Sequence, residues 1–301
     1  MTALRYRAHA KFNLALDVRG KRADGFHEVR TVFQSMALAD TLEVFPTAEG
    51  LAFTCSDPTL PAGADNLVMK AALALRQATG CTKGARMHLT KRIPAQAGLG
   101  GGSADAAVAL VALSRLWRLP PDSSPLMAVA AGLGTDVPFF LLGGTALGVG
   151  RGEEVYALPD APPLHLLIVK GPQGIATVEA YRRMDARLTV PEGTHKIQGI
   201  VRGVVEGGLD DRLLFNSFEE VAGDGEGEAA LRRLLLDCGA RRAILAGSGS
   251  AWVGLFQSRA HAQEAQRRMA HRGISVVLTH TVTRKDYWER TLPRMEKETP
   301  S

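Results

Sequence analysis

The sequence predicts an α+β fold in two lobes, and three observations support this prediction. A chain of 301 residues is longer than one small domain, and 46% hydrophobic with 22% charged residues is a globular composition. The chain opens on a strand-like alternation of polar and apolar residues around a hairpin signal. Helical and strand patterns are then interspersed along the whole length, without an internal repeat. The length of the chain and the order of its helical and strand patterns together favour two lobes over one small domain.

The first half opens with a strand over residues 11–18, where apolar side chains at every second position indicate a half-buried strand. The pair Asp24-Gly25 predicts a turn, and a second strand begins at Val29. The remaining elements expected in this half are a helix over 67–75 capped by Asp65 and ended by Gly80, a strand over 87–93 stopped by Pro94, helices over 104–117 and 126–133, and a strand-like stretch over 143–150.

The segment 160–163 has the sequence Asp-Ala-Pro-Pro, which is typical of a linker. We therefore expect a first domain over residues 1–160 and a second over 161–283. The elements expected in the second are strands over 164–169, 243–246, 251–256 and 274–282, and helices over 197–205, 231–235 and 259–272. Residues 284–301 are charged and are expected to form a frayed tail.

Charge and cysteine content narrow the class of protein. Lys plus Arg is 36 and Asp plus Glu is 31, so the net charge is +5, and the basic residues are dispersed rather than in blocks. A small, dispersed positive net charge can attract an anionic ligand but does not by itself indicate nucleic-acid binding. Three isolated cysteines and no metal-binding histidine spacing argue for a reducing compartment and against a zinc site. With no apolar stretch long enough to cross a bilayer, we expect a soluble cytoplasmic protein.

The densest glycine cluster covers residues 98–103 and leads into a helix. It is not a Rossmann fingerprint, because Ser103 takes the place of the last glycine, and it lacks the lysine of a Walker loop. It is not a nucleophile elbow either, because Asp105 stands where that motif needs glycine. Backbone N–H groups that converge at a helix start suit a phosphate chain. A β-branched side chain at Gly101 should not fit into such a loop. A tight turn without a ligand is the alternative.

Residues 94–107, Pro-Ala-Gln-Ala-Gly-Leu-Gly-Gly-Gly-Ser-Ala-Asp-Ala-Ala, resemble the phosphate loop of the GHMP kinases. The other stretches that resemble this family, in the same order, are residues 10–14, 22–28, 134–140, 216–219 and 245–250. The resemblance implies ATP as phosphoryl donor with Mg²⁺, an N-terminal lobe like ribosomal protein S5 domain 2 and a ferredoxin-like C-terminal lobe. The motif over 22–28 is similar to that of members that phosphorylate the 2-hydroxyl of a cytidine-diphosphate-linked methylerythritol in the non-mevalonate isoprenoid pathway.

The resemblance also implies roles for single residues. Asp136 is the expected proton acceptor and Lys11 the cation beside it; without the resemblance, Asp136 would be a turn or cap residue and Lys11 a solvated lysine. Ser103 is expected to reach Mg²⁺ or a phosphate oxygen, to cap its helix, or both. The expected ATP-binding residues are Pro94, Ala95, Gln96, Ala97, Gly98, Leu99, Gly100, Gly101, Gly102, Ser103 and Ala104. The expected substrate-binding residues are Asn13, Phe26, His27, Thr177 and Tyr181, and a late loop over the phosphates comprises Gly247, Ser248 and Gly249.

Phe26, Gln96, Ala97 and Ala104 depart from the usual pattern of the family, but the core glycines are intact. Two other functions remain open at this point. One is a GHMP kinase that acts on homoserine, mevalonate or a sugar, against which the motif over 22–28 argues. The other is a non-catalytic RNA-binding protein, against which the dispersed charge argues. We expect a small cytidine-diphosphate substrate as partner, no nucleic acid or membrane, and a monomer or homodimer.

Overall fold

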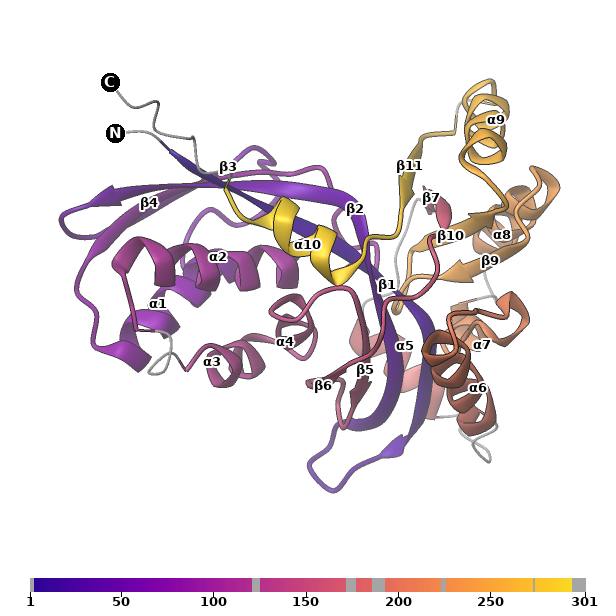
Figure 1. The fold of residues 1–301 in the computed structure, drawn as a ribbon, viewed down its shortest axis with the longest axis horizontal. Coiled ribbons are helices and arrows are strands. Elements are labelled where there is room, and N and C mark those ends of the chain that lie inside the picture. Colours follow the sequence, from indigo (N-terminus) through magenta and orange to yellow (C-terminus); the bar gives the residue numbers. More distant parts are fainter. Residues whose placement is uncertain are drawn as a thin grey trace.

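The computed structural model describes residues 3–120, 125–171, 177–185, 193–222, 226–272 and 274–293, which form two sheets with helices packed on both (Figure 1). Most strand pairs are antiparallel, and helices and strands are interspersed along the chain, which confirms the α+β class. In Figure 1 the first half of the chain lies on the left and most of the second half on the right.

The first sheet has the spatial order β3-β4-β2-β1-β8, with β5 paired to β2 and β6 to β5. Its strands are β1 (Leu4–Lys21), β2 (His27–Thr47), β3 (Leu51–Cys55), β4 (Gly84–Thr90), β5 (Thr145–Val149), β6 (Glu154–Ala157) and β8 (Phe215–Asn216). The predicted hairpin is the antiparallel pair β1–β2. β8 comes from the second half of the sequence, yet it pairs in parallel with β1.

The prediction that the first strand is half-buried is wrong, because both faces of β1 are covered. Its polar residues Lys11, Asn13 and Asp17 are at most 4% exposed. The apolar face packs in a core shared with the second sheet. On the other face the glycine segment lies against Lys11, where Leu99 O accepts a hydrogen bond from Lys11 N at 3.0 Å. Polar side chains enclosed in this way require partners, so β1 places a polar cluster inside the molecule.

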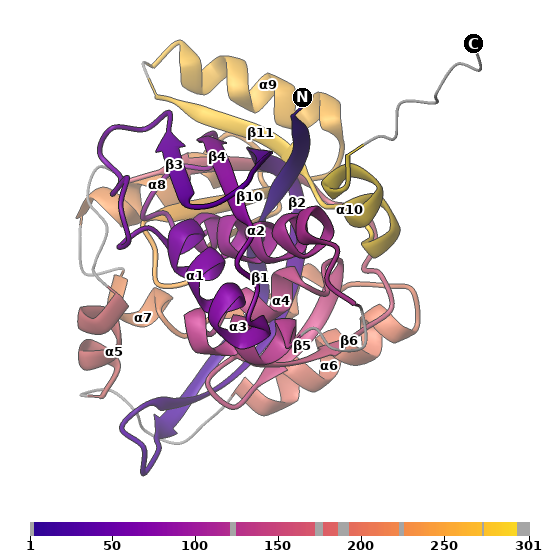
Figure 2. The same cartoon turned by 90° about the vertical axis from the view of Figure 1, so that its left-hand side faces the viewer.

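Four helices of the first half pack together in front of the first sheet in the view of Figure 2. They are α1 (Leu67–Thr79), α2 (Gly101–Trp117), α3 (Leu126–Leu133) and α4 (Val137–Phe140). α2, rich in alanine, leucine and valine, packs closely on β1 and β2. The cap of α1 is Asn66 rather than the expected Asp65, since Asn66 Oδ1 accepts from Val68 N at 2.9 Å. Gly80 ends this helix in the left-handed conformation, as predicted.

The second sheet is antiparallel, with the order β11-β7-β10-β9. Its strands are β7 (His165–Lys170), β9 (Arg242–Leu245), β10 (Ala251–Phe256) and β11 (Val276–His280). The helices of the second half are α5 (Thr177–Asp185), α6 (Gly193–Val205), α7 (Glu219–Ala222), α8 (Glu226–Asp237) and α9 (Arg259–Ala270), with a 3₁₀ turn at Asp211–Leu213. α8 and α9 pack on this sheet, while α6 packs on β1 and β2.

The expectation of a frayed tail from residue 284 is wrong for residues 284–291. These residues form α10 (Arg284–Thr291), which packs against β1 and β2. Tyr287 is fully buried and its hydroxyl donates to Phe140 O at 2.6 Å, while Trp288 Nε1 donates to Leu142 O at 3.1 Å. Two aromatic anchors therefore dock a helix whose charged residues suggested a tail. The last part of the expected tail, residues 294–301, lies outside the described residues.

A continuous apolar core lies between the two sheets. Its larger members are Phe12, Leu14, Met36, Leu166, Ile168, Ile200, Val253 and Leu255. The predicted division at residue 160 falls between β6 and β7, where the chain passes from one sheet to the other. It remains a prediction, and this shared core joins the two parts that it would separate.

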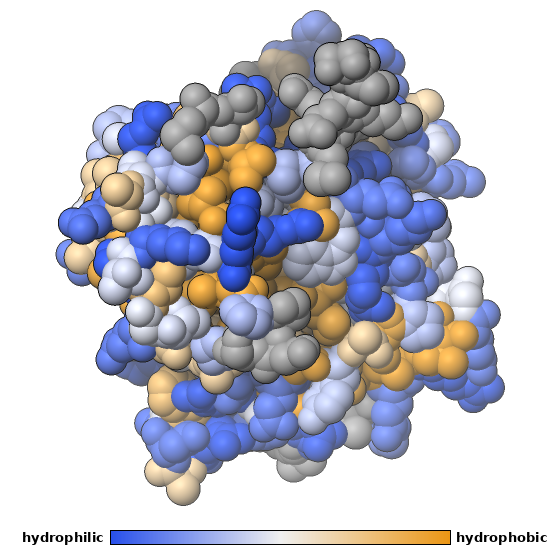
Figure 3. Space-filling model, turned by 60° about the vertical axis from the view of Figure 1, so that its left-hand side comes forward, coloured by the Kyte–Doolittle hydropathy of each residue, from blue (hydrophilic) through white to orange (hydrophobic). Residues whose placement is uncertain are grey.

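On the face shown in Figure 3, hydrophilic residues surround hydrophobic ones that gather near the centre. Among the described residues, no helix is long and apolar enough to span a membrane.

Candidate active site

Lys11 and Asp136, the two predicted catalytic residues, form an ion pair inside the molecule. Lys11 Nζ lies 3.2 Å from Asp136 Oδ2, with the lysine side chain 4% and the aspartate side chain 31% exposed. Asp136 precedes α4 but its side chain makes no capping hydrogen bond, which removes the cap interpretation. Lys11 is not the solvated lysine of the alternative. A buried cation and a partly open carboxylate thus face the same space.

A chain of hydrogen bonds fixes the position of Lys11. Its Nζ donates to Asn13 Oδ1 at 3.1 Å, as expected for two residues on one face of β1. Asn13 Nδ2 in turn lies 2.7 Å from Thr31 Oγ1, and Thr31 Oγ1 donates to Ala15 O at 2.7 Å. The ammonium also lies 5.4 Å from the centre of the Phe33 ring, within cation–π range. Sequence reasoning missed Thr31 and Phe33, which lie on the neighbouring strand.

Two positions of the glycine loop require glycine most, and neither of them is Gly101, the position singled out from the sequence. Gly98 and Gly100 have φ of 73° and 70°, whereas Gly101 is the first residue of α2 and has no positive φ. A Cβ on Gly98 would overlap the Ala246 carbonyl oxygen, and one on Gly100 would meet the Phe140 ring at 2.7 Å. Backbone approaches the loop closely at Gly98, and side chains do so at Gly100. The positive φ that a β-branched residue resists occurs at these two glycines, while a Cβ on Gly101 would meet the Ile93 side chain at 3.1 Å.

Two cavities meet at this loop. One, of about 460 Å³, is lined by residues 94–103 of the loop together with Asn66, Lys91 and Asp105. The other, of about 350 Å³, is lined by the Lys11–Asp136 pair, Asn13, Tyr181, Gly247 and Ser248. Gly98, Gly100 and Ser103 line both cavities, so the loop separates two adjoining spaces. Ser103 lies inside α2 and does not cap it, since the cap position is Gly100. Ala104 is fully buried and lines neither cavity.

The late loop lies directly against the glycine loop. A Cβ on Gly247 would meet Gly98 O at 3.0 Å, and Ala251 N donates to Ala97 O at 3.3 Å. Asn216 Nδ2 donates to Leu245 O at 2.8 Å and to Gly247 O at 2.7 Å, which holds the late loop in place. Gly247 and Ser248 line the cavity with Lys11, whereas Gly249 does not.

The predicted substrate residues outside β1 include an aromatic pair, His27 and Tyr181. The His27 ring stacks on Tyr181, with centroids 4.6 Å apart, and His27 Nε2 lies 2.6 Å from Asp185 Oδ1. Burial and the negative charge of Asp136 raise the pKa of Tyr181 to about 12. Phe26 is 52% exposed and lies under the Arg151 guanidinium, 4.8 Å away. The side chain of Thr177 lies outside the described part of the structure.

A buried charged cluster that the sequence analysis missed lies behind the glycine loop. Lys91 Nζ donates to Asp105 Oδ2 at 2.7 Å and to Asp40 Oδ2, and Asp40 Oδ1 also accepts from Arg92 N and Ile93 N. Burial raises the pKa of Asp105 to about 8, with the nearby Asp40 charge adding to the effect and Lys91 opposing it. The cluster ties the chain before the loop to the helix after it. No linear motif joins these residues, which are up to 65 positions apart.

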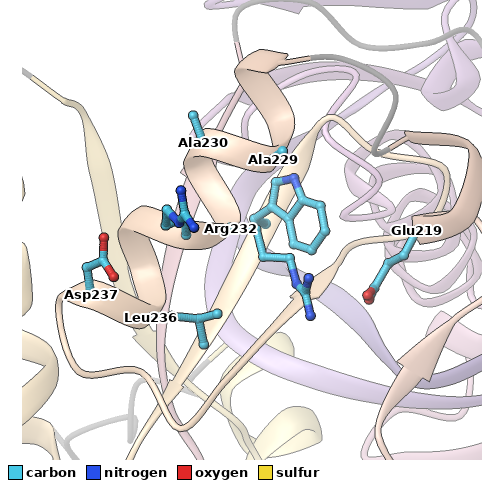
Figure 4. A pocket seen from close by; sticks show the side chains of 8 residues that line it. Glu219, Ala229, Ala230, Arg232, Leu236 and Asp237 are labelled. Atoms are coloured by element: carbon cyan, nitrogen blue, oxygen red, sulfur yellow. The ribbon is translucent and has the colours of Figure 1, made fainter.

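A third cavity, larger than the two at the glycine loop, lies elsewhere and is lined by none of the predicted site residues. It measures about 780 Å³, lies beside α8, and is lined by Glu219, Ala229, Ala230, Arg232, Arg233, Leu236, Asp237 and Trp252 (Figure 4). Glu219 lies on the opposite side of this cavity from Asp237 in the view of Figure 4. Glu219 Oε1 accepts a hydrogen bond from Leu245 N at 3.2 Å, and burial raises the pKa of Glu219. Glu219 is thus bound to the edge of the second sheet rather than to the site.

The described residues contain no group of three or more His, Cys, Asp or Glu that could hold a metal ion. Mg²⁺, the metal that the family resemblance implies, keeps several waters and is usually bound by few protein oxygens together with substrate phosphates. The partly exposed Ser103, on the wall shared by the two cavities, is placed to contribute such an oxygen.

Comparisons with known proteins identify the family. The family "GHMP kinases N terminal domain" matches residues 66–144. The 4-diphosphocytidyl-2-C-methyl-D-erythritol kinase of Pelotomaculum thermopropionicum is 43% identical over 91% of this chain and 96% of its own. That of Moorella thermoacetica is 38% identical over 94% of this chain and 100% of its own.

Solved structures extend the agreement to the fold. A crystal structure of 4-(cytidine 5'-diphospho)-2C-methyl-D-erythritol kinase superimposes with a TM-score of 0.79 at 34% identity, covering 92% of this chain and 98% of that one. Homoserine kinase from Cytophaga hutchinsonii shares the fold, with a TM-score of 0.71 at 19% identity and coverage of 94% and 95%. The chain is therefore a GHMP kinase and belongs to the 4-diphosphocytidyl-2-C-methyl-D-erythritol kinase family.

Proposed function

We propose that this protein transfers a phosphoryl group from ATP to the 2-hydroxyl of 4-diphosphocytidyl-2-C-methyl-D-erythritol, in the non-mevalonate route to isoprenoid precursors. The observation that supports this most is the junction of the two cavities. The glycine loop is the wall between them, and the Lys11–Asp136 pair faces the second. Such an arrangement suits in-line transfer, in which positioning and charge neutralisation supply most of the catalysis.

In this proposal the cavity with Lys11 takes the acceptor alcohol. Asp136, the more exposed partner of the pair, accepts the proton of the hydroxyl as its oxygen attacks phosphorus. Lys11 is held at a fixed position by Asn13, so its ammonium stabilises negative charge that develops on the transferred group without having to reorganise. The bond from phosphorus to the bridging oxygen breaks, and the nucleotide diphosphate leaves with that oxygen.

The cavity of about 460 Å³ takes the nucleotide in this proposal. The positive φ angles of Gly98 and Gly100 turn the backbone at the start of α2, where N–H groups without helical partners and the helix dipole favour phosphate oxygens. Mg²⁺, when bound, neutralises phosphate charge, and Ser103 is the protein oxygen we assign to it. Gly247, Ser248 and Gly249 cover the phosphates from the second half.

The cytosine base is assigned to the aromatic pair. His27 and Tyr181 already stack on each other, and Tyr181 lines the cavity with Asp136. For a base to bind between Phe26 and Tyr181, the His27 ring would have to move off the Tyr181 ring. Asp185 would remain as the partner that orients His27. The protein is expected to act in the cytoplasm as a monomer or homodimer.

A coupled assay of ADP release over a panel of alcohols tests the assignment. The panel holds 4-diphosphocytidyl-2-C-methyl-D-erythritol, its uridine analogue, homoserine, mevalonate and galactose. We expect turnover with the cytidine compound and at least a hundredfold lower kcat/KM with homoserine, mevalonate and galactose, because a site built to hydrogen-bond one substrate leaves its polar groups unpaired with another. A higher kcat/KM for homoserine or mevalonate would assign a different substrate. Salt-sensitive RNA binding without ADP release would contradict the kinase assignment altogether.

A further inference from the structure

A positively charged groove lies where the two sheets meet, apart from the two cavities at the glycine loop. It measures about 330 Å³ and shares no lining residue with either cavity. One wall comes from the first sheet and the segment after β4, and the other from β7, β11 and the start of α9. Its lining residues are Arg7, Ala37, Leu38, Ala39, Arg92, His165, Arg259, Leu278, Thr279 and His280.

Three guanidinium groups and two imidazoles face this small space without an acidic residue in the lining. Among the described residues, Arg7, Arg92 and Arg259 have no ion-pair partner within 4.0 Å. No carboxylate in the described part of the chain therefore compensates the charge of these three guanidinium groups within that distance. Like charges this close repel one another, and a bound anion would remove that repulsion.

The ionisation of the groove residues reflects this crowding. The pKa of Arg7 is lowered by burial and by the positive charges of Arg92 and Arg290. The pKa of His280 is lowered by burial and by Arg290, His165 and Arg259, with Asp286 of α10 as the opposing carboxylate. A net positive field therefore persists in the groove, although one acid of α10 reaches it.

The start of α9 adds a second kind of anion donor. Ser258 caps this 12-residue helix by accepting from His261 N, and Arg259 is the first helical residue. The first turn of a helix carries N–H groups without helical acceptors and a partial positive charge. Because Arg259 lines the groove, this helix start and the guanidinium groups act on the same space.

We propose that this groove is a second anion-binding site, which takes the diphosphate group of a small molecule and joins the two sheets through it. A diphosphate offers enough charge for three guanidinium groups, which bind phosphate oxygens in bidentate geometry. Ala37, Leu38 and Leu278 give the groove an apolar surface, which favours a diphosphate ester with a short apolar group over free phosphate. The groove is short, at about 330 Å³, which suits a small anion better than the extended backbone of a nucleic acid.

Calorimetric titration of pyrophosphate into the whole protein, with a non-hydrolysable ATP analogue saturating the nucleotide cavity, tests the proposal. We expect binding at one site per chain, weakened about tenfold in Arg7→Gln and in Arg259→Gln, as for one lost charge-assisted hydrogen bond. Arg267→Gln is the matched control, because Arg267 lies on the same helix but pairs with Glu264, 2.5 Å away. It should bind pyrophosphate like the unmodified protein. Thermal unfolding without ligand shows that each variant is folded.

Further ligands separate the possible sources of the anion. A diphosphate of a short alkyl alcohol should bind more tightly than pyrophosphate, and inorganic phosphate more weakly. Equal pyrophosphate affinity in the unmodified protein and the Arg7→Gln and Arg259→Gln variants would overturn the site. Tighter binding of single-stranded RNA, with a steep salt dependence lost in the same variants, would overturn the small-molecule assignment in favour of a nucleic-acid surface. The difference between variants measures the groove alone, so the result does not depend on the proposed kinase substrate.

Discussion

Replacing Asp105 by asparagine should stabilise the protein more and more as the pH rises from 5 to 8. Lys91 is shared between Asp40 and Asp105, so two buried carboxylates compete for one cation. Asp105 Oδ1 is buried and has no hydrogen-bond partner among the described residues. An amide at this position keeps an oxygen for Lys91 and gains an N–H that can donate to Asp40. The substitution therefore removes the excess negative charge with little change in shape.

The size of the effect follows from the two states of the carboxyl group. Burial and Asp40 raise the pKa of Asp105 to about 8 in the folded protein, against about 3.9 in an unfolded chain. Between these values the folded state holds a proton that the unfolded state releases, so the free energy of unfolding falls as the pH rises. Each pH unit is worth about 1.4 kcal/mol, which gives a loss of about 4 kcal/mol between pH 5 and pH 8. Asparagine does not titrate and removes this loss.

Urea unfolding at pH 5, 6, 7 and 8 measures the prediction. The unfolding free energies of the unmodified protein and Asp105→Asn should be close at pH 5 and diverge by about 4 kcal/mol at pH 8. Asp40→Asn is the contrasting variant, because Asp40 also accepts from Arg92 N and Ile93 N, and an amide there breaks the buried pairing. It should be less stable at every pH. Parallel curves for the unmodified protein and Asp105→Asn would refute the reasoning.

Three further outcomes follow from the site. Asp136→Asn should lower kcat by roughly 10²–10⁴-fold with unchanged ATP affinity, and near-normal turnover at saturating substrate would remove Asp136 from the mechanism. Gly98→Ala should abolish ATP binding in calorimetry because its Cβ overlaps a carbonyl oxygen, whereas in Gly102→Ala, whose Cβ would only touch a leucine methyl group at 3.3 Å, ATP should still bind. Tyr181→Ala should raise the KM of the cytidine substrate roughly 5–150-fold but not that of ATP, as expected for a lost base–aromatic contact. His27→Ala should in addition reduce the preference for cytidine over uridine, and a change in the KM of ATP instead would contradict both assignments.

Local signals predicted a large part of the fold. Periodicity located the strands of the first hairpin and α3 and α8, and the glycine cluster located the start of α2, because these features depend on neighbours within a few residues. The Lys11–Asp136 pair was predicted through the family motifs, since 125 positions separate the two residues. Without the family motifs, Asp136 would be interpreted as a turn or cap residue; it does lie in a turn, but its side chain makes no capping hydrogen bond.

Features that depend on distant packing were not predictable in this way. The strand over residues 11–18 was expected to be half-buried, but its polar residues Lys11, Asn13 and Asp17 are buried as well. Lys91, Asp40 and Asp105 meet only because β2 and β4 pair in one register and α2 approaches the sheet at one angle. Neither condition can be predicted from residues that are close in sequence. In α10 the charged residues outnumber the apolar ones, so composition indicated a tail, although Tyr287 and Trp288 dock the helix on the first half of the chain.

The docking of α10 on the first sheet has a consequence for how the chain acquires its structure. During synthesis the first 160 residues leave the ribosome before β8 and α10 exist, yet β8 completes the sheet beside β1 and α10 covers Phe140 and Leu142. Until β8 and α10 are made, the first 160 residues therefore have an incomplete sheet edge and an exposed apolar surface. Contacts between residues so far apart in sequence slow folding and expose intermediates to aggregation. The nascent protein should be most prone to aggregation before β8 and α10 have emerged, when a chaperone would offer the greatest protection.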